Sequence, residues 1–191
     1  MPNLCSNQLT ITGPEADVKA FVDGAEGKDS LVDAYHPMPE ELRDTTFGYP
    51  GDKDEVRNAM RAKYGEPDWY EWAHTNWGTK WGDYDTDLMA NEPGLAVYLY
   101  TTAWGPMEAA IKAFSSKFPT LDFTCSYEES GMCLLGAFRY VNGQLRGQSW
   151  IEGEEWPELI DKDGDEDWAS YDAALSDLRD RVISDVEEVI A

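Results

Sequence analysis

The order of the periodic segments between residues 8 and 127 is the feature that most constrains the fold of this chain. Polar and apolar residues alternate over 8–12, and Gly13-Pro14 ends that run, so we expect a strand followed by a helix that begins at Pro14. Further along, the patterns predict two strands joined by a turn, an amphipathic helix and a last strand, at residues 81–88, 95–102, 106–118 and 121–127. This order predicts an α+β fold, a ferredoxin-like βαββαβ antiparallel sheet.

Two additions to this sheet are expected. Residues 24–76 form a helical, Trp-rich insertion, which is irregular over 24–52 because Gly, Pro and Asp are frequent there, and helical over 54–64. An extra hairpin is predicted at residues 132–151, because Asn142-Gly143 is the strongest short-range hairpin signal available.

The chain is predicted to divide into a ferredoxin-like domain at residues 1–151 and an acidic helical extension at 152–191 that packs on it. Residues 151–191 contain 15 acidic and 3 basic side chains, against 23 and 12 in residues 1–150. Apolar residues at spacings of three and four indicate a helix with one buried face, formed by Trp168, Tyr171, Leu175, Leu178, Val182, Val186 and Val189. We expect Trp156 and Trp168 to anchor the extension to the domain.

The net charge of −23, from 38 acidic and 15 basic residues, restricts the partners of this chain. A surface of this sign repels phosphate, which argues against direct binding to DNA, RNA or an anionic membrane. The 8 Trp, 10 Tyr and 6 Met nevertheless supply bulky apolar side chains for a core. No stretch approaches the roughly 20 apolar residues of a membrane span, no secretory signal opens the sequence, and the three cysteines lack metal-binding spacing. We therefore expect a cytoplasmic protein with free thiols.

Several short motifs resemble one known family. They are Pro2-Asn3-Leu4-Cys5-Ser6-Asn7, Asn76-Trp77-Gly78-Thr79-Lys80-Trp81, Thr102-Ala103-Trp104-Gly105-Pro106 and the turn at Gly131-Met132. Over roughly residues 1–148 the chain is similar to the YubB ferredoxin-like domain family of phage- and plasmid-borne proteins, with Leu4 where that family has Trp. The resemblance implies a ferredoxin-like fold and an origin in a mobile element. It implies no activity and no catalytic residues.

The acidic extension is the candidate functional segment. A helix rises about 1.5 Å per residue and duplex DNA carries about one charge per 1.7 Å, so carboxylates on neighbouring helical rows can imitate phosphates. We expect an anti-defence inhibitor that blocks the cationic DNA- or RNA-binding channel of a host protein, such as a CRISPR effector or a restriction enzyme, without turnover. The carboxylates expected to bind this partner are Glu154, Glu155, Glu158, Asp161, Asp163, Asp165, Asp167, Asp172, Asp177, Asp180 and Asp185.

Two other hypotheses remain open for the extension. It could be a solvated helix face in a non-catalytic accessory module, which forms homo-oligomers through the sheet or through residues 168–189. Residues 161–172 also resemble a calcium loop, with Asp161, Asp163 and Asp165 at the first, third and fifth positions. The glycine of that loop is at the fourth position instead of the sixth, which favours weak screening by cations over a specific metal site.

The sequence contains no motif for catalysis, and we expect neither enzymatic activity nor a cofactor. His36 and His74 have no nucleophile motif beside them. The aromatic run at residues 69–81 has little positive charge beside it, apart from Lys80 and the basic cluster at residues 53–63, which favours packing over stacking with nucleic-acid bases. One catalytic hypothesis concerns Pro2, which would become a terminal secondary amine after removal of Met1.

Overall fold

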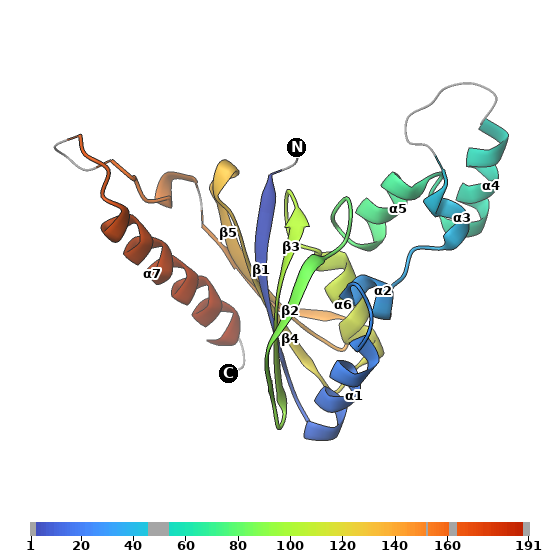
Figure 1. Cartoon of the computed structure of the whole chain (residues 1–191), viewed down its shortest axis with the longest axis horizontal. Coiled ribbons are helices and arrows are strands. Elements are labelled where there is room, and N and C mark those ends of the chain that lie inside the picture. Colours follow the sequence, from blue (N-terminus) through green and yellow to red (C-terminus); the bar gives the residue numbers. More distant parts are fainter. Residues whose placement is uncertain (1–2, 46–53, 152, 161–163, 189–191) are drawn as a thin grey trace.

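The computed structural model describes residues 3–45, 54–151, 153–160 and 164–188, which adopt the predicted α+β ferredoxin-like fold (Figure 1). The strands are β1 (Leu4–Thr12), β2 (Tyr84–Glu92), β3 (Leu95–Ala103), β4 (Asp122–Glu129), β5 (Leu134–Val141) and β6 (Gln144–Trp150). They form a six-stranded antiparallel sheet in the order β2-β3-β1-β4-β5-β6. The first four strands in this order are the ferredoxin-like unit, and β5 and β6 are the predicted extra hairpin, which widens the sheet beyond β4.

Helices cover the two faces of the sheet unequally (Figure 1). The two helices of the βαββαβ pattern, α1 (Glu15–Ala25) and α6 (Glu108–Lys117), lie on one face. The inserted helices, on the same side, are α2 (Leu31–Tyr35), α3 (Glu40–Arg43), α4 (Asp54–Tyr64) and α5 (Trp69–Asn76). On the opposite face α7 (Trp168–Glu187) packs mainly against β5 and β6. The outer surfaces of β2, β3 and β1 therefore remain open on that face.

Alternation along the strands divides their side chains between the two faces. In β1, Leu9 and Ile11 are fully buried on the side of α1 and α6, whereas the residues between them point to the other face. Phe21 of α1 meets Phe123 of β4 edge to face, with ring centroids 5.6 Å apart. Burial of each such ring contributes roughly 1.5–3 kcal/mol to stability. The main core therefore lies between the sheet and these helices, as the periodicity of the sequence predicts.

Residues 24–45 are more regular than predicted, because they contain α2 and α3. Hydrogen bonds to the first turn of α2 explain the difference. Ser30 Oγ accepts from Asp33 N at 3.1 Å, and the buried carboxylate of Asp83 accepts from Leu31 N at 2.7 Å and Val32 N at 2.9 Å. The rest of the predicted irregular stretch, residues 46–52, lies outside the described residues. The helix predicted at 54–64 is confirmed as α4.

The first strand of the β2–β3 hairpin lies further along the chain than predicted. The pattern placed it at 81–88, whereas β2 spans Tyr84–Glu92 and ends in a turn at Pro93-Gly94. Gly82 has a φ of +72°, and the carboxylate of Asp83 is hydrogen-bonded to the first turn of α2. Both features keep residues 81–83 out of the strand. β2 is an edge strand with two register shifts, which disfavour its pairing with another sheet edge.

Candidate functional site

The acidic helix α7 is held to the sheet by its apolar stripe. Leu175, Val182 and Val186 are buried, and the last two belong to a hydrophobic cluster on this face of the sheet. The other buried members of that cluster are Leu135, Ala137 and Ile151. Gly147 of β6 allows the close approach, because a Cβ there would lie only 3.1 Å from the carbonyl oxygen of Val186. The predicted buried face of the helix is thus correct over most of its length.

One of the two predicted tryptophan anchors is confirmed and the other is wrong. Trp156 is half-buried against the cluster, and its Nε1 donates to the Tyr171 hydroxyl at 3.2 Å. Trp168 is 55% exposed, and its Nε1 donates to Glu166 at 3.0 Å. The reason is the direction of α7, whose first turn lies away from the sheet (Figure 1). Val189, the last residue of the predicted stripe, lies outside the described residues.

Two arginines fix the polar sides of α7. Arg179 Nε donates to Glu128 Oε2 of β4 at 2.7 Å. Arg181 donates to Glu155 in the 3₁₀ turn η2 (Gly153–Glu155) at 2.6 Å. The sequence analysis did not single out either arginine. The sequence feature that could have identified them is that they are the only two basic residues between positions 163 and 191.

Three of the predicted binding carboxylates are engaged inside the chain. Glu155 pairs with Arg181, and Asp185 accepts a hydrogen bond from Ser149 Oγ at 2.7 Å. Asp167 caps α7, because it accepts from the backbone N–H of Ser170 at 3.1 Å and from its hydroxyl at 2.7 Å. These bonds stabilise the ionised form and lower the pKa of Asp167. This carboxylate therefore shapes the helix as well as adding charge.

Five other predicted carboxylates are exposed, namely Glu158, Asp165, Asp172, Asp177 and Asp180. The last three lie on the solvent side of α7, and no ion pair with a described residue neutralises them. The side chain of Glu154, and Asp161 and Asp163, lie outside the described residues. The helix thus presents uncompensated negative charge on the side that faces away from the sheet.

A groove of about 370 Å³ separates α7 from the open strands. Its floor includes Ser6, Gln8, Leu99, Thr101 and Ser126, and its helical wall includes Arg179 and Val182. Among the described residues, no hydrogen bond of a hydroxyl in this lining involves a histidine or a carboxylate, and the Tyr100 hydroxyl contacts Cys125 Sγ at 3.4 Å. Its aliphatic, hydroxyl and amide groups are suited to contact with another side chain.

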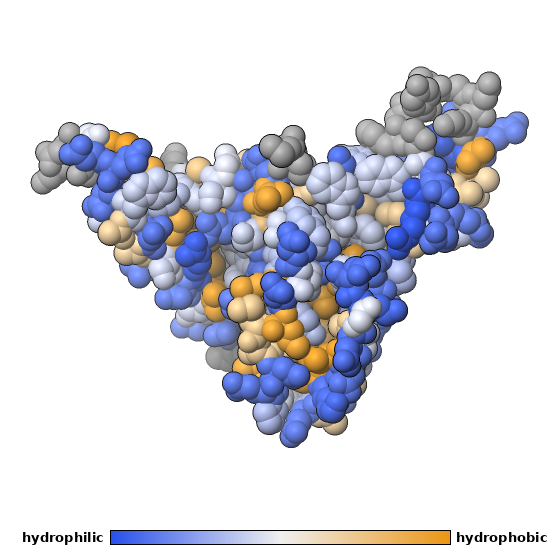
Figure 2. Space-filling view, viewed as in Figure 1, coloured by the Kyte–Doolittle hydropathy of each residue, from blue (hydrophilic) through white to orange (hydrophobic). Residues whose placement is uncertain are grey.

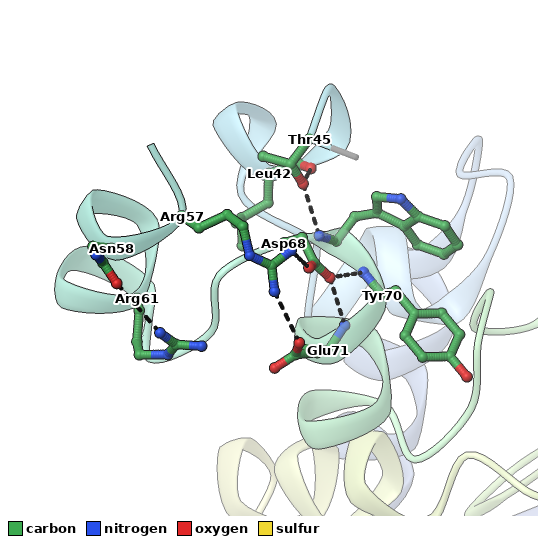
Figure 3. Close-up of polar contacts among 9 residues, drawn as sticks. Leu42, Thr45, Arg57, Asn58, Arg61, Asp68, Tyr70 and Glu71 are labelled. Atoms are coloured by element: carbon green, nitrogen blue, oxygen red, sulfur yellow. Dashed lines mark hydrogen bonds and ion pairs between the residues drawn. The ribbon is translucent and has the colours of Figure 1, made fainter. Parts of the chain in front are cut away.

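Two cations of the basic cluster, Arg57 and Lys63, form ion pairs within the insertion (Figure 3). Arg57 donates to the buried carboxylate of Asp68 at 2.5 Å and to Glu71 at 3.2 Å, both in the region of α5. Lys63 pairs with Glu41 of α3 at 2.7 Å. These cations are therefore not available as a phosphate-binding patch.

The aromatic run beside this cluster serves mainly in packing, as predicted. Trp72 and Trp77 are buried, with their rings edge to face at 5.4 Å, and Trp69 packs on the same core. Trp81 differs from them, because it is 44% exposed and carries the ammonium of Lys80 over its ring at 4.7 Å. A continuous stacking platform for bases is not formed by these residues.

Other candidate chemistry is weak in the part of the chain that the structure describes. All three cysteines are free, and burial raises the pKa of Cys5 and of Cys125 to about 12, so these two thiols stay protonated at neutral pH. No three described His, Cys, Asp or Glu side chains converge as a metal site. No described helix has the length and hydropathy needed to cross a membrane. Pro2, the hypothetical catalytic amine, lies outside the described residues.

One comparison with known proteins identifies a type of domain. Residues 76–167 match the family model of the ferredoxin-like domain in Api92-like protein. The crystal structure of protein api92 from Yersinia pseudotuberculosis is similar over 80% of this chain and 99% of that chain, with 8% sequence identity and a TM-score of 0.48. No curated protein matches the sequence. The family match begins later than the predicted resemblance at residues 1–148 and extends into the acidic segment. It supports a ferredoxin-like domain similar to the one in Api92-like protein.

Proposed function

We propose that this protein is a non-catalytic inhibitor, of phage or mobile-element origin, that imitates nucleic acid and blocks the cationic DNA- or RNA-binding channel of a host defence protein. A CRISPR effector and a restriction enzyme are the partner types with such a channel. The observation that carries the proposal is the exposed, uncompensated charge of Asp172, Asp177 and Asp180 on a helix that is packed on the sheet.

The spacing of these carboxylates fits a phosphate-binding channel. Asp177 and Asp180 are three residues apart, which corresponds to about 4.5 Å along a helix axis and places them on neighbouring rows. The ordered helix supports the proposal, because a partner that binds it does not have to order the charges first. The apolar cluster beneath α7 and the Arg179–Glu128 ion pair provide this order.

The distribution of positive charge supports the same function. Seven described cations form internal ion pairs, namely Lys19, Arg43, Arg57, Lys63, Arg139, Arg179 and Arg181. Ion pairing thus reduces the positive charge that the described residues offer to a nucleic acid, and the net charge of −23 attracts a basic protein surface instead.

Oligomerisation through the predicted stripe of α7 receives less support. That stripe is covered by β5 and β6 of the same chain, so an oligomer formed through it would have to displace the helix. An accessory module that associates through another surface stays a prediction.

A competition assay tests the proposed function. Labelled duplex DNA bound to purified CRISPR effectors and restriction endonucleases would be displaced by the full chain, and fluorescence anisotropy would give the half-inhibitory concentration. We expect D172N/D177N/D180N to raise this concentration roughly tenfold, at about 0.5 kcal/mol per charge. The matched control is E15Q/E26Q/E92Q, which removes the same charge from exposed positions outside α7. Equal losses for the two triple variants, or no displacement by the native chain from any enzyme, would count against the proposal.

A further inference from the structure

The four exposed tryptophans lie at one end of the sheet. Trp81, Trp104, Trp150 and Trp168 are between 44% and 55% exposed, whereas the other four tryptophans are buried or half-buried. Trp81 precedes β2, Trp104 follows β3 and Trp150 ends β6, so the antiparallel order places all three at the same end of the sheet, with β2 and β6 at its two edges. Trp168 begins α7 on the same side of the molecule (Figure 1).

Two further apolar side chains continue this surface. Leu4, at the start of β1, is 57% exposed, and Met132, in the 3₁₀ turn η1 (Ser130–Met132) between β4 and β5, is 51% exposed. Figure 2 shows aromatic rings in pale colours along this upper rim. From β2 to β6 the surface crosses five strand spacings, about 24 Å. We call these six residues the tryptophan end: Leu4, Trp81, Trp104, Met132, Trp150 and Trp168. Large apolar side chains gathered in this way mark interaction surfaces, whereas single ones do not.

The backbone at the centre of the tryptophan end is strained and firmly held. Trp104 has a φ of +72°, which a large side chain rarely adopts. Its backbone N–H donates to the Asn3 carbonyl at 3.0 Å, and Thr102 Oγ1 donates to the Gly105 carbonyl at 2.8 Å. Such strain persists where the surroundings fix it, and it concentrates at functional sites. Here it presents the indole of Trp104 to solvent.

The charges around the tryptophan end indicate what it binds. Trp168 is bonded to Glu166, and the exposed Glu158 lies in the same connection between β6 and α7. Lys80 already stacks on Trp81, which shows that a cation is accepted on these rings. No other described ring or cation packs on Trp104 or Trp150. Open indoles beside carboxylates are suited to a guanidinium, which stacks on the ring and donates to the acid.

We infer that the tryptophan end is the docking face for the cationic partner, whose arginine side chains stack on Trp104, Trp150 and Trp168 and pair, beside Trp168, with Glu166. This inference rests on the proposed function and adds to it the face that binds. Tryptophan and arginine are the residues that most often dominate the energy of protein interfaces, which fits this pairing. The net charge of −23 argues against nucleic acid as the occupant of this face, because it repels phosphate.

Labelled nona-arginine and nona-lysine are the probes that test this inference, because they carry the same charge and differ in stacking. We would titrate each with the full chain at about 100 mM salt and follow fluorescence anisotropy. Nona-arginine should bind more tightly than nona-lysine. W104A, W150A and W168A, which keep the net charge, should each weaken nona-arginine binding roughly three- to tenfold and nona-lysine binding less. M89A, which removes a 61% exposed side chain from β2, is the matched control and should change neither.

A second measurement avoids variants that fail to fold. Bound nona-arginine should protect the exposed indoles of the native chain from quenching by acrylamide, and nona-lysine should protect them less. Unchanged nona-arginine affinity in folded Trp variants, or equal protection by both peptides, overturns the docking face. If salt-dependent binding persists in that case and D172N/D177N/D180N weakens it, the proposed function survives without this face. Absence of salt-dependent binding to either peptide counts against both.

Discussion

Arg179 on α7 lies across the groove from Glu128 on β4 and donates to it through Nε at 2.7 Å, so a single ion pair links the acidic helix to the centre of the sheet. Glu128 is largely shielded from solvent, with 16% of its side chain exposed, which limits screening of this pair. We expect R179Q to cost about 1 kcal/mol and to increase amide hydrogen exchange throughout α7. R181Q removes the same charge one half-turn further along, but its partner Glu155 lies in η2 and outside the sheet. Equal exchange in the two variants would contradict the assigned role of Arg179.

The Arg57–Asp68 pair predicts an unequal response of two arginines in α4 (Figure 3). Asp68 is fully buried, so R57A leaves an ionised carboxylate without its cation and should lower the free energy of unfolding by about 3 kcal/mol. R61A removes the same charge from an exposed side chain whose bond within the described residues is to the neutral Asn58, and it should cost less than about 0.5 kcal/mol. Urea denaturation followed by tryptophan fluorescence gives both values. Similar costs would show that Asp68 is supported adequately by the backbone groups that it caps.

His36 predicts a loss of stability in mild acid. Burial lowers the pKa of His36 below its ordinary value of 6.5, and Lys117 adds to this shift. The unfolded chain therefore takes up the proton first as the pH falls, so the stability present above pH 6.5 is lost progressively as the pH drops towards the folded-state pKa. H36Q should flatten the dependence of the unfolding free energy between about pH 7.5 and 5.5. The same slope in H36Q and in the native chain would exclude His36 as the cause.

The excess of carboxylates predicts that salt stabilises the fold. Repulsion within a chain of net charge −23 favours expanded states, and ions screen it. Between low and moderate ionic strength a gain of about 1 kcal/mol would raise the melting temperature by roughly 2–4 °C. D172N/D177N/D180N should show a smaller salt effect, because part of the repulsion has been removed. Calorimetry at several chloride concentrations measures this, and a melting temperature that falls with salt would contradict it.

The elements with a clear local sequence pattern were predicted best. Alternation in β1 and β4 identified the buried faces of both strands, and the Asn142-Gly143 turn identified the β5–β6 hairpin. Ser30 caps α2 locally, but α2 was missed because two of its first N–H groups are bonded by Asp83, more than 50 residues further along the chain. The Gly and Pro residues of that stretch indicated an irregular loop. In the structure, a distant carboxylate accepts the hydrogen bonds of two backbone N–H groups there.

The candidate site was predicted only in outline. Spacing in the extension identified the buried stripe of α7 and hence the charged side. Whether a single carboxylate is bonded within the chain depends on neighbours that spacing does not reveal, such as Ser149 for Asp185. Trp168 shares the period of the stripe, yet the helix begins away from the sheet, so periodicity alone misassigned it. That the exposed tryptophans share one end of the sheet could be recognised only from the strand order, which places positions 81, 104 and 150 at that end.

The sheet separates two apolar clusters that have no residue in common, a large one beneath α1 and α6 and a small one beneath α7. A partition of this kind uncouples their melting, because release of the small cluster exposes little of the large one. The acidic helix can then detach while the rest of the domain stays folded. A partner that binds this segment can therefore separate it from the sheet without unfolding the main core.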